Sequence, residues 1–249
     1  METYRKYYND ELLVKELEFL QEKKDELREI INSVSNPEPY VVELAGLPRT
    51  GKTVTVERIT DFFKFGKINV VKTTEPAQII KDTHTPEQLA NMSRVEFNDK
   101  TLEISKRELE RLKNDPKNTI IIQDRGVIDN YFWYQMMYED GTISEEQFKE
   151  ILKSLPIDLQ MMDKLYVMTA LPEEIITRDY RNSIYLEPRK KTTLENVTKL
   201  KQGLESLLSN VDDERIIKID TTYYPELRTA TTIADNIMDG IKDKIYTKK

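Results

Sequence analysis

Five short apolar runs alternate with longer amphipathic segments from residue 40 onward. The runs do not alternate between polar and apolar residues, which is typical of strands buried on both faces of a parallel sheet. They are 40–45 (YVVELA), 68–72 (INVVK), 119–123 (TIIIQ), 164–168 (KLYVM) and 215–219 (RIIKI). The segments between them have apolar residues at helical spacing. The pattern therefore predicts an α/β fold with a five-stranded parallel sheet and helices on both faces.

Helices are expected wherever the apolar spacing changes to a repeat of three or four residues. A long charged helical stretch begins at Pro86 and continues to about Asn114, with one break expected inside it. The second strand leads into a loop that contains Glu75 and Pro76. The remaining helices are expected at about 52–63, 127–138, 144–154, 172–181, 192–208 and 225–244.

Residues 10–33 form a separate helical pattern before the first strand. Apolar residues recur at alternating spacings of four and three, with an interruption at Lys24, and the turn-forming segment 33–38 (SVSNPE) ends the pattern. The apolar positions are Leu13, Leu17, Leu20, Leu27 and Ile31. Such a helix either packs on the main domain or pairs with a second copy as a short coiled coil in a homodimer. We therefore divide the chain into an N-terminal helical extension, 1–36, and a main domain, 37–249.

The composition excludes several kinds of chemistry. The 249 residues include no cysteine and a single histidine, His84, which excludes disulfides, thiolate nucleophiles and zinc sites built from cysteines or several histidines. A bound metal would instead be a hard cation with oxygen ligands. Lysine and arginine number 38 against 45 aspartate and glutamate residues, and the resulting net charge of -7 argues against a nucleic-acid partner.

No apolar run approaches the roughly 18 residues that a membrane-spanning helix needs. The N-terminal segment METYRKYYNDELLVKEL carries charges where a secretory signal peptide needs an uninterrupted apolar stretch. We therefore expect no membrane partner and a soluble, cytoplasmic protein.

The clearest motif lies between the first strand and the first helix of the main domain. The segment 46–53 (GLPRTGKT) matches the phosphate-binding pattern GxxxxGK[ST] and stands in the strand–loop–helix context that the pattern requires. Its glycines let backbone N–H groups surround a phosphate. Lys52 would reach the β- and γ-phosphates of ATP, and the Thr53 hydroxyl would bind Mg²⁺. We assign nucleotide binding to Gly46, Arg49, Thr50, Gly51, Lys52 and Thr53, with Lys52 also catalytic and Thr53 also a metal ligand.

Two acidic residues are expected at the same edge of the sheet as this loop. Asp124 follows the third strand directly, where P-loop proteins place a metal-binding carboxylate, and Arg125 beside it would neutralise charge on a transferring phosphate. Glu75 follows the second strand, and Pro76 holds it extended, so its carboxylate would point towards the same crevice. There it could accept a proton from an acceptor hydroxyl. We assign Asp124 to the metal and to catalysis, and Glu75 and Arg125 to catalysis.

A further group of charged residues is rich in arginine. Arg178 and Arg181 are three residues apart on one helical face, and Arg189 follows ahead of two lysines. A basic segment that closes over a triphosphate would exclude water and spread the transition-state charge. We assign Arg178 and Arg181 to catalysis and Arg189 to nucleotide binding.

Taken in order, these motifs resemble those of the thymidylate kinase and deoxynucleoside kinase group of P-loop phosphotransferases, over roughly residues 40–243. The loop with Arg49, the pair Glu75-Pro76 and the pair Asp124-Arg125 are similar to the corresponding motifs of that group. The resemblance implies ATP and Mg²⁺ as cofactors. It also implies lid arginines at Arg178, Arg181 and Arg189 and an adenine-binding loop at Asp220 and Thr221.

Other positions depart from that group. Pro48 stands where thymidylate kinases have an aspartate that recognises the acceptor nucleotide, and Thr74 replaces an arginine. Gly126 stands where the group has tyrosine, histidine or serine. The guanine-specific motif [NT]KxD is absent after the later strands, which disfavours a GTPase. The chain also lacks room for the additional helical subdomain of AAA+ motors, which disfavours that class.

We therefore expect an ATP- and Mg²⁺-dependent phosphotransferase that acts on a nucleoside, a nucleotide or a similar small acceptor. The main alternative is a regulatory ATPase or nucleotide-gated interaction protein without small-molecule transfer, because the acceptor motifs are altered and an N-terminal helix is added. A kinase that acts on nucleic-acid ends is a third alternative, which a strong salt dependence of oligonucleotide binding would support.

Overall fold

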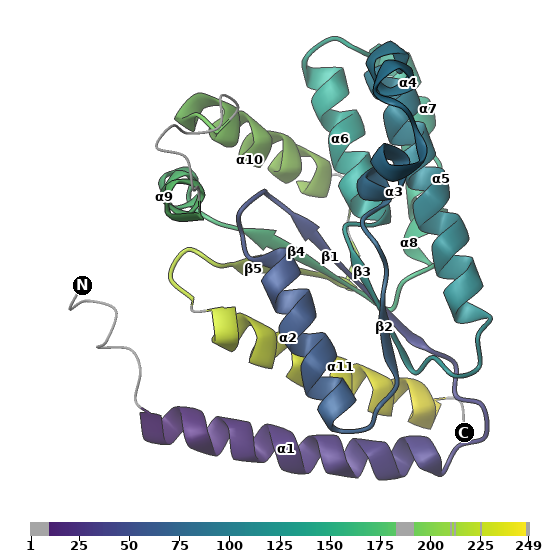
Figure 1. The fold of residues 1–249 in the computed structure, drawn as a ribbon, viewed down its shortest axis with the longest axis vertical. Helices are drawn as coiled ribbons and strands as arrows, with labels where there is room; N and C mark the ends of the chain where they lie inside the picture. Colours follow the sequence, from purple (N-terminus) through teal and green to yellow (C-terminus); the bar gives the residue numbers. More distant parts are fainter. Residues whose placement is uncertain (1–9, 183–191, 210, 212, 225, 248–249) are drawn as a thin grey trace.

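Five parallel strands form the centre of the computed structural model, which describes residues 10–182, 192–209, 211, 213–224 and 226–247. The strands are β1 (Tyr40–Gly46), β2 (Val70–Lys72), β3 (Ile120–Asp124), β4 (Lys164–Thr169) and β5 (Ile216–Asp220). They lie in the order β2-β3-β1-β4-β5 (Figure 1). The chain leaves β1 for one face of the sheet and leaves β3 for the other. The carboxyl ends of these two neighbouring strands are therefore the position where open α/β sheets bind ligands. The predicted α/β fold with a five-stranded parallel sheet is confirmed.

Helices cover both faces of the sheet, because successive β1 side chains enter opposite cores: Val42 and Leu44 on one side, Val41 and Ala45 on the other. The first core is covered by α2 (Lys52–Phe65) and α11 (Glu226–Thr247). The second is covered by α5 (Arg94–Lys113), α6 (Val127–Glu139), α7 (Glu145–Leu152), α8 (Leu155–Leu159), α9 (Pro172–Asn182) and α10 (Leu194–Ser209). Within the described segments, no helix is both long enough and apolar enough to cross a membrane.

The segment after β2 differs from the sequence-based expectation. A loop is expected after Glu75, but the structure has a helix there, α3 (Pro76–Thr83), so the loop prediction is wrong beyond Glu75. Pro76 occupies the first turn of α3, where its missing N–H and fixed φ are tolerated. The expected break in the next stretch is confirmed: α4 (Pro86–Asn91) ends before Ser93, whose hydroxyl caps α5.

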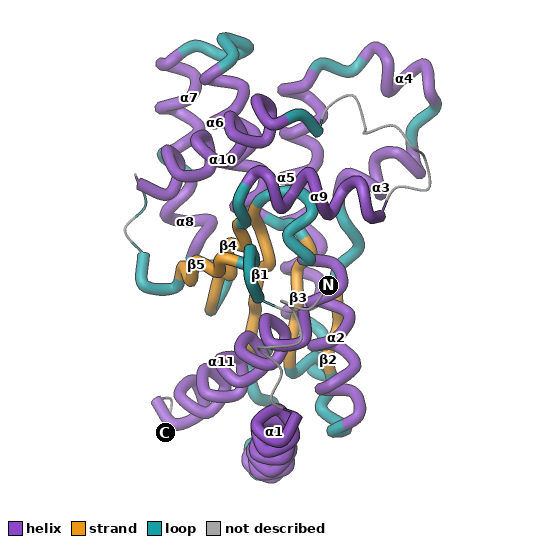
Figure 2. The backbone as a smooth tube through the Cα atoms, turned by 90° about the vertical axis from the view of Figure 1, so that its left-hand side faces the viewer, coloured by secondary structure: helices purple, strands orange, loops and turns teal. Residues whose placement is uncertain are grey.

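The N-terminal helix α1 (Asp10–Asn32) forms a further layer outside α11 (Figure 2). Leu20 and Leu27 are buried in the core shared with α2 and α11. Lys24, where the apolar pattern is interrupted, is also buried: its Nζ donates a hydrogen bond to the Phe62 carbonyl oxygen at 3.3 Å and lies 4.2 Å from the Phe62 ring centroid. This burial lowers the Lys24 pKa. The predicted helix is thus confirmed and packs on the sheet-bearing part of the chain, while a homodimer and the division into two domains stay predictions.

Candidate functional site

The loop between β1 and α2 contains three residues with positive φ. Gly46 has φ 117°, Arg49 60° and Gly51 90°. A Cβ atom at Gly46 would lie 2.2 Å from the Met168 carbonyl oxygen of β4, so only glycine fits there. Gly51 immediately precedes α2, whose first turn has N–H groups without partners inside the helix. This geometry is that of a phosphate-binding loop at a helix N-terminus.

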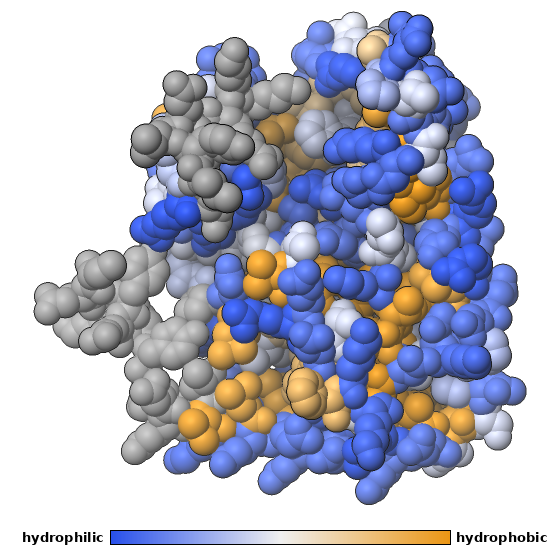
Figure 3. All heavy atoms as spheres, viewed as in Figure 1, coloured by the Kyte–Doolittle hydropathy of each residue, from blue (hydrophilic) through white to orange (hydrophobic). Residues whose placement is uncertain are grey.

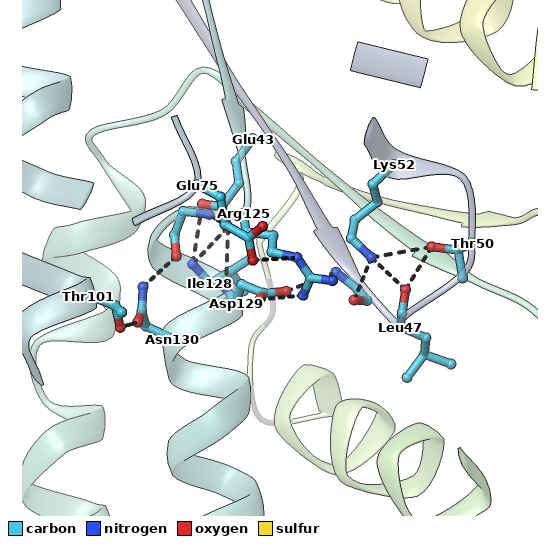
Figure 4. Close-up of polar contacts among 12 residues, drawn as sticks. Glu43, Leu47, Thr50, Lys52, Glu75, Thr101, Arg125, Ile128, Asp129 and Asn130 are labelled. Carbon is cyan, nitrogen blue, oxygen red and sulfur yellow. Dashed lines mark hydrogen bonds and ion pairs between the residues drawn. The ribbon is translucent and has the colours of Figure 1, made fainter. Parts of the chain in front are cut away.

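Lys52, the first residue of α2, is 4% exposed and its side chain bends back over the loop (Figure 4). Its Nζ donates hydrogen bonds to the carbonyl oxygens of Gly46, at 2.9 Å, and Leu47, and lies 3.4 Å from Thr50 Oγ1. Burial lowers the Lys52 pKa to about 7; the positive charge of Arg125 adds to this effect and nearby carboxylates oppose it. A phosphate in the loop would stabilise the charged form of this ammonium group.

Asp124 and Thr53 supply oxygen atoms that fit a divalent cation. Asp124 ends β3 beside Leu44 of the central strand, and its Oδ1 is buried with no hydrogen-bond partner among the described residues. Thr53 is exposed in the first turn of α2. Within the described part of the chain, no three acidic or histidine side chains are arranged so that they could hold a metal ion by themselves, so phosphate oxygens would have to complete the coordination. Mg²⁺ in phosphate sites uses few protein ligands, and these two residues suit it.

Arg125 joins the turn after β3 to its neighbours (Figure 4). It has φ 60°, and its backbone N–H donates to the Leu44 carbonyl oxygen at 3.1 Å. Its guanidinium lies 3.0 Å from Asp129 Oδ2 and 3.3 Å from Glu75 Oε1. The Asp129 charge is the main reason that the Arg125 pKa is raised. Asp129 Oδ1 also accepts the Gly46 N–H at 3.4 Å, which ties this group to the phosphate-binding loop. We call Glu75, Asp124, Arg125 and Asp129 the acid–arginine cluster.

The second half of α9 also contacts the phosphate-binding loop, and Arg178 in it contacts the loop after β5. Arg49 Nε lies 2.6 Å from Oδ1 of Asp179, which is buried in α9. Arg178 donates to the Arg49 carbonyl oxygen at 3.4 Å and to Thr221 Oγ1 at 3.0 Å. Thr221 is buried, whereas Asp220 before it is exposed. Three residues predicted on separate grounds, Arg49, Arg178 and Thr221, are therefore brought together.

Among the described residues, the predicted arginine Arg181 is not part of these contacts. Arg181 is exposed in the last turn of α9. Arg189 lies outside the described residues. In Figure 3 the surface is hollowed beside α6, towards α3 and α4, above the carboxyl edge of the sheet. The phosphate-binding loop and the acid–arginine cluster lie at that same edge.

Comparison with known protein families assigns this architecture. The model of the family AAA_28, described as an AAA domain, matches residues 41–202. The chain belongs to this AAA domain family. The match starts in β1 and ends in α10, so it includes the phosphate-binding loop, Glu75 and the Asp124-Arg125 turn. None of the curated proteins compared with this AAA domain matches it.

The family makes this AAA domain a P-loop nucleotide-binding protein. The finer resemblance to thymidylate and deoxynucleoside kinases stays a prediction. The sequence disfavours AAA+ motors because it leaves no room for their additional helical subdomain. The family match shows that the chain nevertheless belongs to a family described as an AAA domain. Within the described residues, the chain after α10 forms β5 and α11, which belong to the sheet and to the layer that covers it. The chain thus belongs to the AAA domain family, although its described part shows no additional helical subdomain after α10.

Two buried acids shape the site of this AAA domain although neither belongs to a recognised motif. Asp129 contacts both Gly46 and Arg125, and its sequence signal is its place one helical turn after Arg125. Glu43 lies inside β1, is 0% exposed and accepts hydrogen bonds from backbone N–H groups at the start of α6. Burial raises the Glu43 pKa to about 7, although these hydrogen bonds act in the opposite direction. Its sequence signal is a charge within an otherwise apolar strand.

Proposed function

We propose that this AAA-domain protein is a phosphotransferase that uses ATP and Mg²⁺ and acts on a nucleoside, a nucleotide or a similar small acceptor. One observation carries the proposal: Arg125 lies within ion-pair distance of Glu75 and of Asp129, and Asp129 contacts the phosphate-binding loop. An arginine and a half-exposed carboxylate therefore stand next to the place where the terminal phosphate of ATP would lie. This pair suits an acceptor hydroxyl, which must lose a proton when it receives the phosphoryl group.

The nucleotide side of the reaction is assigned to the loop. Its backbone N–H groups and Lys52 bind the phosphates of ATP. Thr53 and the unpartnered oxygen of Asp124 would hold Mg²⁺, which supplies charge neutralisation between the phosphates when bound. Lys52 is already buried against the loop carbonyls, so its side chain is ordered before the nucleotide binds. This pre-organisation lowers the entropy cost of binding phosphate.

The acceptor side is assigned to the acid–arginine cluster. The Glu75 side chain is 47% exposed, so an acceptor can reach it, while Arg125 is mostly buried and held by Asp129. Glu75 accepts the proton of the acceptor hydroxyl, and Arg125 stabilises negative charge on the transferring phosphoryl group. Arg178 and Thr221 support the nucleotide from α9 and from the loop after β5, where Asp220 and Thr221 would contact the base. Arg181 and Arg189 remain the candidate arginines for closure over the triphosphate.

The test is ATP turnover with a panel of nucleosides, nucleoside monophosphates and coenzyme precursors, in which ADP and phosphorylated product are both quantified. The proposal expects one acceptor class to give product in equal amount to ADP. A Lys52→Ala preparation serves as the background control. If ADP forms but none of the acceptors in the panel is phosphorylated, the phosphotransferase assignment is overturned.

A second function, a regulatory ATPase or nucleotide-gated interaction protein, is favoured by one observation on α1. This helix lies outside the family-matched segment, and it leaves Val14 51% and Phe19 58% exposed. That function predicts ADP without product, together with an ATP-dependent change in assembly state. Phe19→Ser should abolish such a change in sedimentation velocity, because it removes an exposed apolar contact and leaves the buried Leu20 and Leu27 in place. Unchanged sedimentation with and without ATP would rule this alternative out.

A further inference from the structure

Glu43 is a buried carboxylate at the centre of the sheet. It lies in the central strand β1, is 0% exposed, and shares its face with the apolar residues Val41 and Ala45. An ionised group is costly in such a place unless it is hydrogen-bonded, and an apolar residue would fill the space at lower cost. The position of Glu43 therefore calls for an explanation beyond packing.

Among the described residues, the Glu43 carboxylate accepts its hydrogen bonds from the start of α6 in the next layer. Its carboxylate accepts the backbone N–H groups of Gly126 at 3.0 Å, Ile128 at 3.1 Å and Asp129 at 3.2 Å. The residue that precedes α6 is Gly126, which has no side chain to cap the helix. Glu43 thus performs from a neighbouring strand the capping that a serine or aspartate usually provides locally. The helix dipole also favours a negative charge at this end.

Gly126 is fitted to this carboxylate. A Cβ atom at position 126 would lie 2.8 Å from Glu43 Oε2 and 2.7 Å from Gln123 Oε1. A larger residue would push the carboxylate away from the N–H groups or move the turn. The kinase group that the sequence resembles has tyrosine, histidine or serine at the position of Gly126. In this chain the Glu43 carboxylate occupies the space that such a side chain would need.

The segment that Glu43 holds carries the residues of the candidate site. Arg125 immediately precedes Gly126, and Asp129 lies in the first turn of α6. Asp129 reaches both the Gly46 N–H of the phosphate-binding loop and the Arg125 guanidinium. The position of the first α6 turn consequently sets the distance between the acid–arginine cluster and the loop.

We infer that Glu43 is a positioning residue for phosphoryl transfer, which anchors the first turn of α6 so that Arg125 and Asp129 meet the phosphate-binding loop. The effect on turnover rests on the proposed function. The anchoring of α6 by Glu43 does not depend on the proposed function, and a separate experiment measures it.

The first test compares Glu43→Gln with Tyr131→Phe in the full chain. Glu43→Gln retains the side-chain volume and one acceptor oxygen, but it removes the negative charge and replaces the second oxygen, which also accepts the Ile128 N–H, with an NH₂ group. Tyr131→Phe removes a buried hydrogen bond from α6 to Asp158, away from the site. Glu43→Gln should lower kcat at least about tenfold and leave the Kd for ATP within about threefold, because the altered group acts on the transition state rather than on nucleotide binding. Tyr131→Phe should keep kcat within about twofold. Equal loss of kcat in the two variants would show a merely structural role and overturn the inference.

The second test needs no activity. Backbone amide hydrogen exchange should accelerate in Glu43→Gln at Gly126, Ile128 and Asp129, and also at Gly46, whose N–H is linked to Glu43 through Asp129. Tyr131→Phe should leave the exchange at Gly46 unchanged, and Gly126→Ala should reproduce the Glu43→Gln pattern. Unchanged exchange at Gly46 in both Glu43→Gln and Gly126→Ala would overturn the anchoring. If the unaltered protein phosphorylates no acceptor, the proposed function fails while this measurement still decides the role of Glu43.

Discussion

The phosphate-binding loop and the acid–arginine cluster adjoin each other but are built in different ways. The loop consists of eight consecutive residues, 46–53, whose positive-φ glycines and buried Lys52 shape it locally. The cluster joins Glu75 after β2 to three residues around the β3–α6 turn, and it meets the loop because β2, β3 and β1 are neighbours in the sheet. A local site tolerates distant changes, whereas an assembled site depends on every element that supports it. The two regions should therefore respond differently to substitution.

The largest expected effect lies in the loop. Lys52→Ala removes the ammonium that would contact the β- and γ-phosphates, and turnover should fall by about 10²–10³-fold, as for other charge-stabilising groups. Lys64→Ala, an exposed lysine in the last turn of the same helix, is the matched control and should have no effect on turnover. Steady-state kinetics with ATP varied measures both. Retention of turnover in Lys52→Ala would remove the phosphate-binding role from the loop.

The next effect should separate the cluster from the loop. Glu75→Gln removes the carboxylate that would accept the acceptor proton, so transfer should fall by about 10²-fold while the Kd for ATP stays the same. Glu87→Gln, an exposed acid in the first turn of α4, is the control. Product formation and equilibrium ATP binding are measured side by side. If Glu75→Gln weakens ATP binding as much as it lowers transfer, Glu75 does not act on the acceptor alone, and the separate roles of loop and cluster are contradicted.

A smaller effect is expected at Asp124, the member of the acid–arginine cluster that is proposed to bind Mg²⁺ together with Thr53 of the loop. Asp124→Asn keeps the shape of the side chain but weakens its buried oxygen as a cation ligand, so half-saturation by Mg²⁺ should rise about 10–100-fold. Asp61→Asn, on the exposed face of α2, should leave the Mg²⁺ requirement unchanged. Turnover measured against Mg²⁺ concentration distinguishes them. An unchanged Mg²⁺ requirement in Asp124→Asn would exclude this carboxylate from the metal site.

The smallest effect is a pH dependence of ATP binding. Because the Lys52 pKa is lowered to about 7 by burial, the ammonium is mostly deprotonated above that pH in the free protein, and phosphate binding must return a proton to it. The association constant should therefore fall as pH rises from 7 to 9, by at most about tenfold per pH unit. Calorimetry in two buffers of different ionisation enthalpy measures the proton uptake. Equal uptake by Lys52→Ala would assign the proton to another group.

The periodicity of the chain predicted the five strands and most helices because long apolar runs carry a strong signal. The helix after Glu75 was not predicted, since a segment of eight residues that begins with proline has little periodicity to detect. The burial of Lys24 was not predicted either, because its charge interrupts the apolar pattern, while in the fold its stem lies against Gly66 and its ammonium over Phe62. At Lys24 a tertiary contact therefore outweighs the local pattern.

By itself, the sequence determined the phosphate-binding loop, because the residues that shape it are adjacent in the chain and glycine at 46 and 51 permits the positive φ that the loop needs. It also predicted the burial of β1, β3 and β4, whereas the edge strands β2 and β5, which have similar apolar runs, are only partly buried. Only the tertiary structure decided that Arg125 is shared between Glu75 and Asp129, and that Glu43 anchors the helix carrying Asp129. These contacts join residues up to 86 positions apart, as between Glu43 and Asp129. The physical reason is that a buried charge is tolerated only where the fold brings hydrogen-bond partners to it.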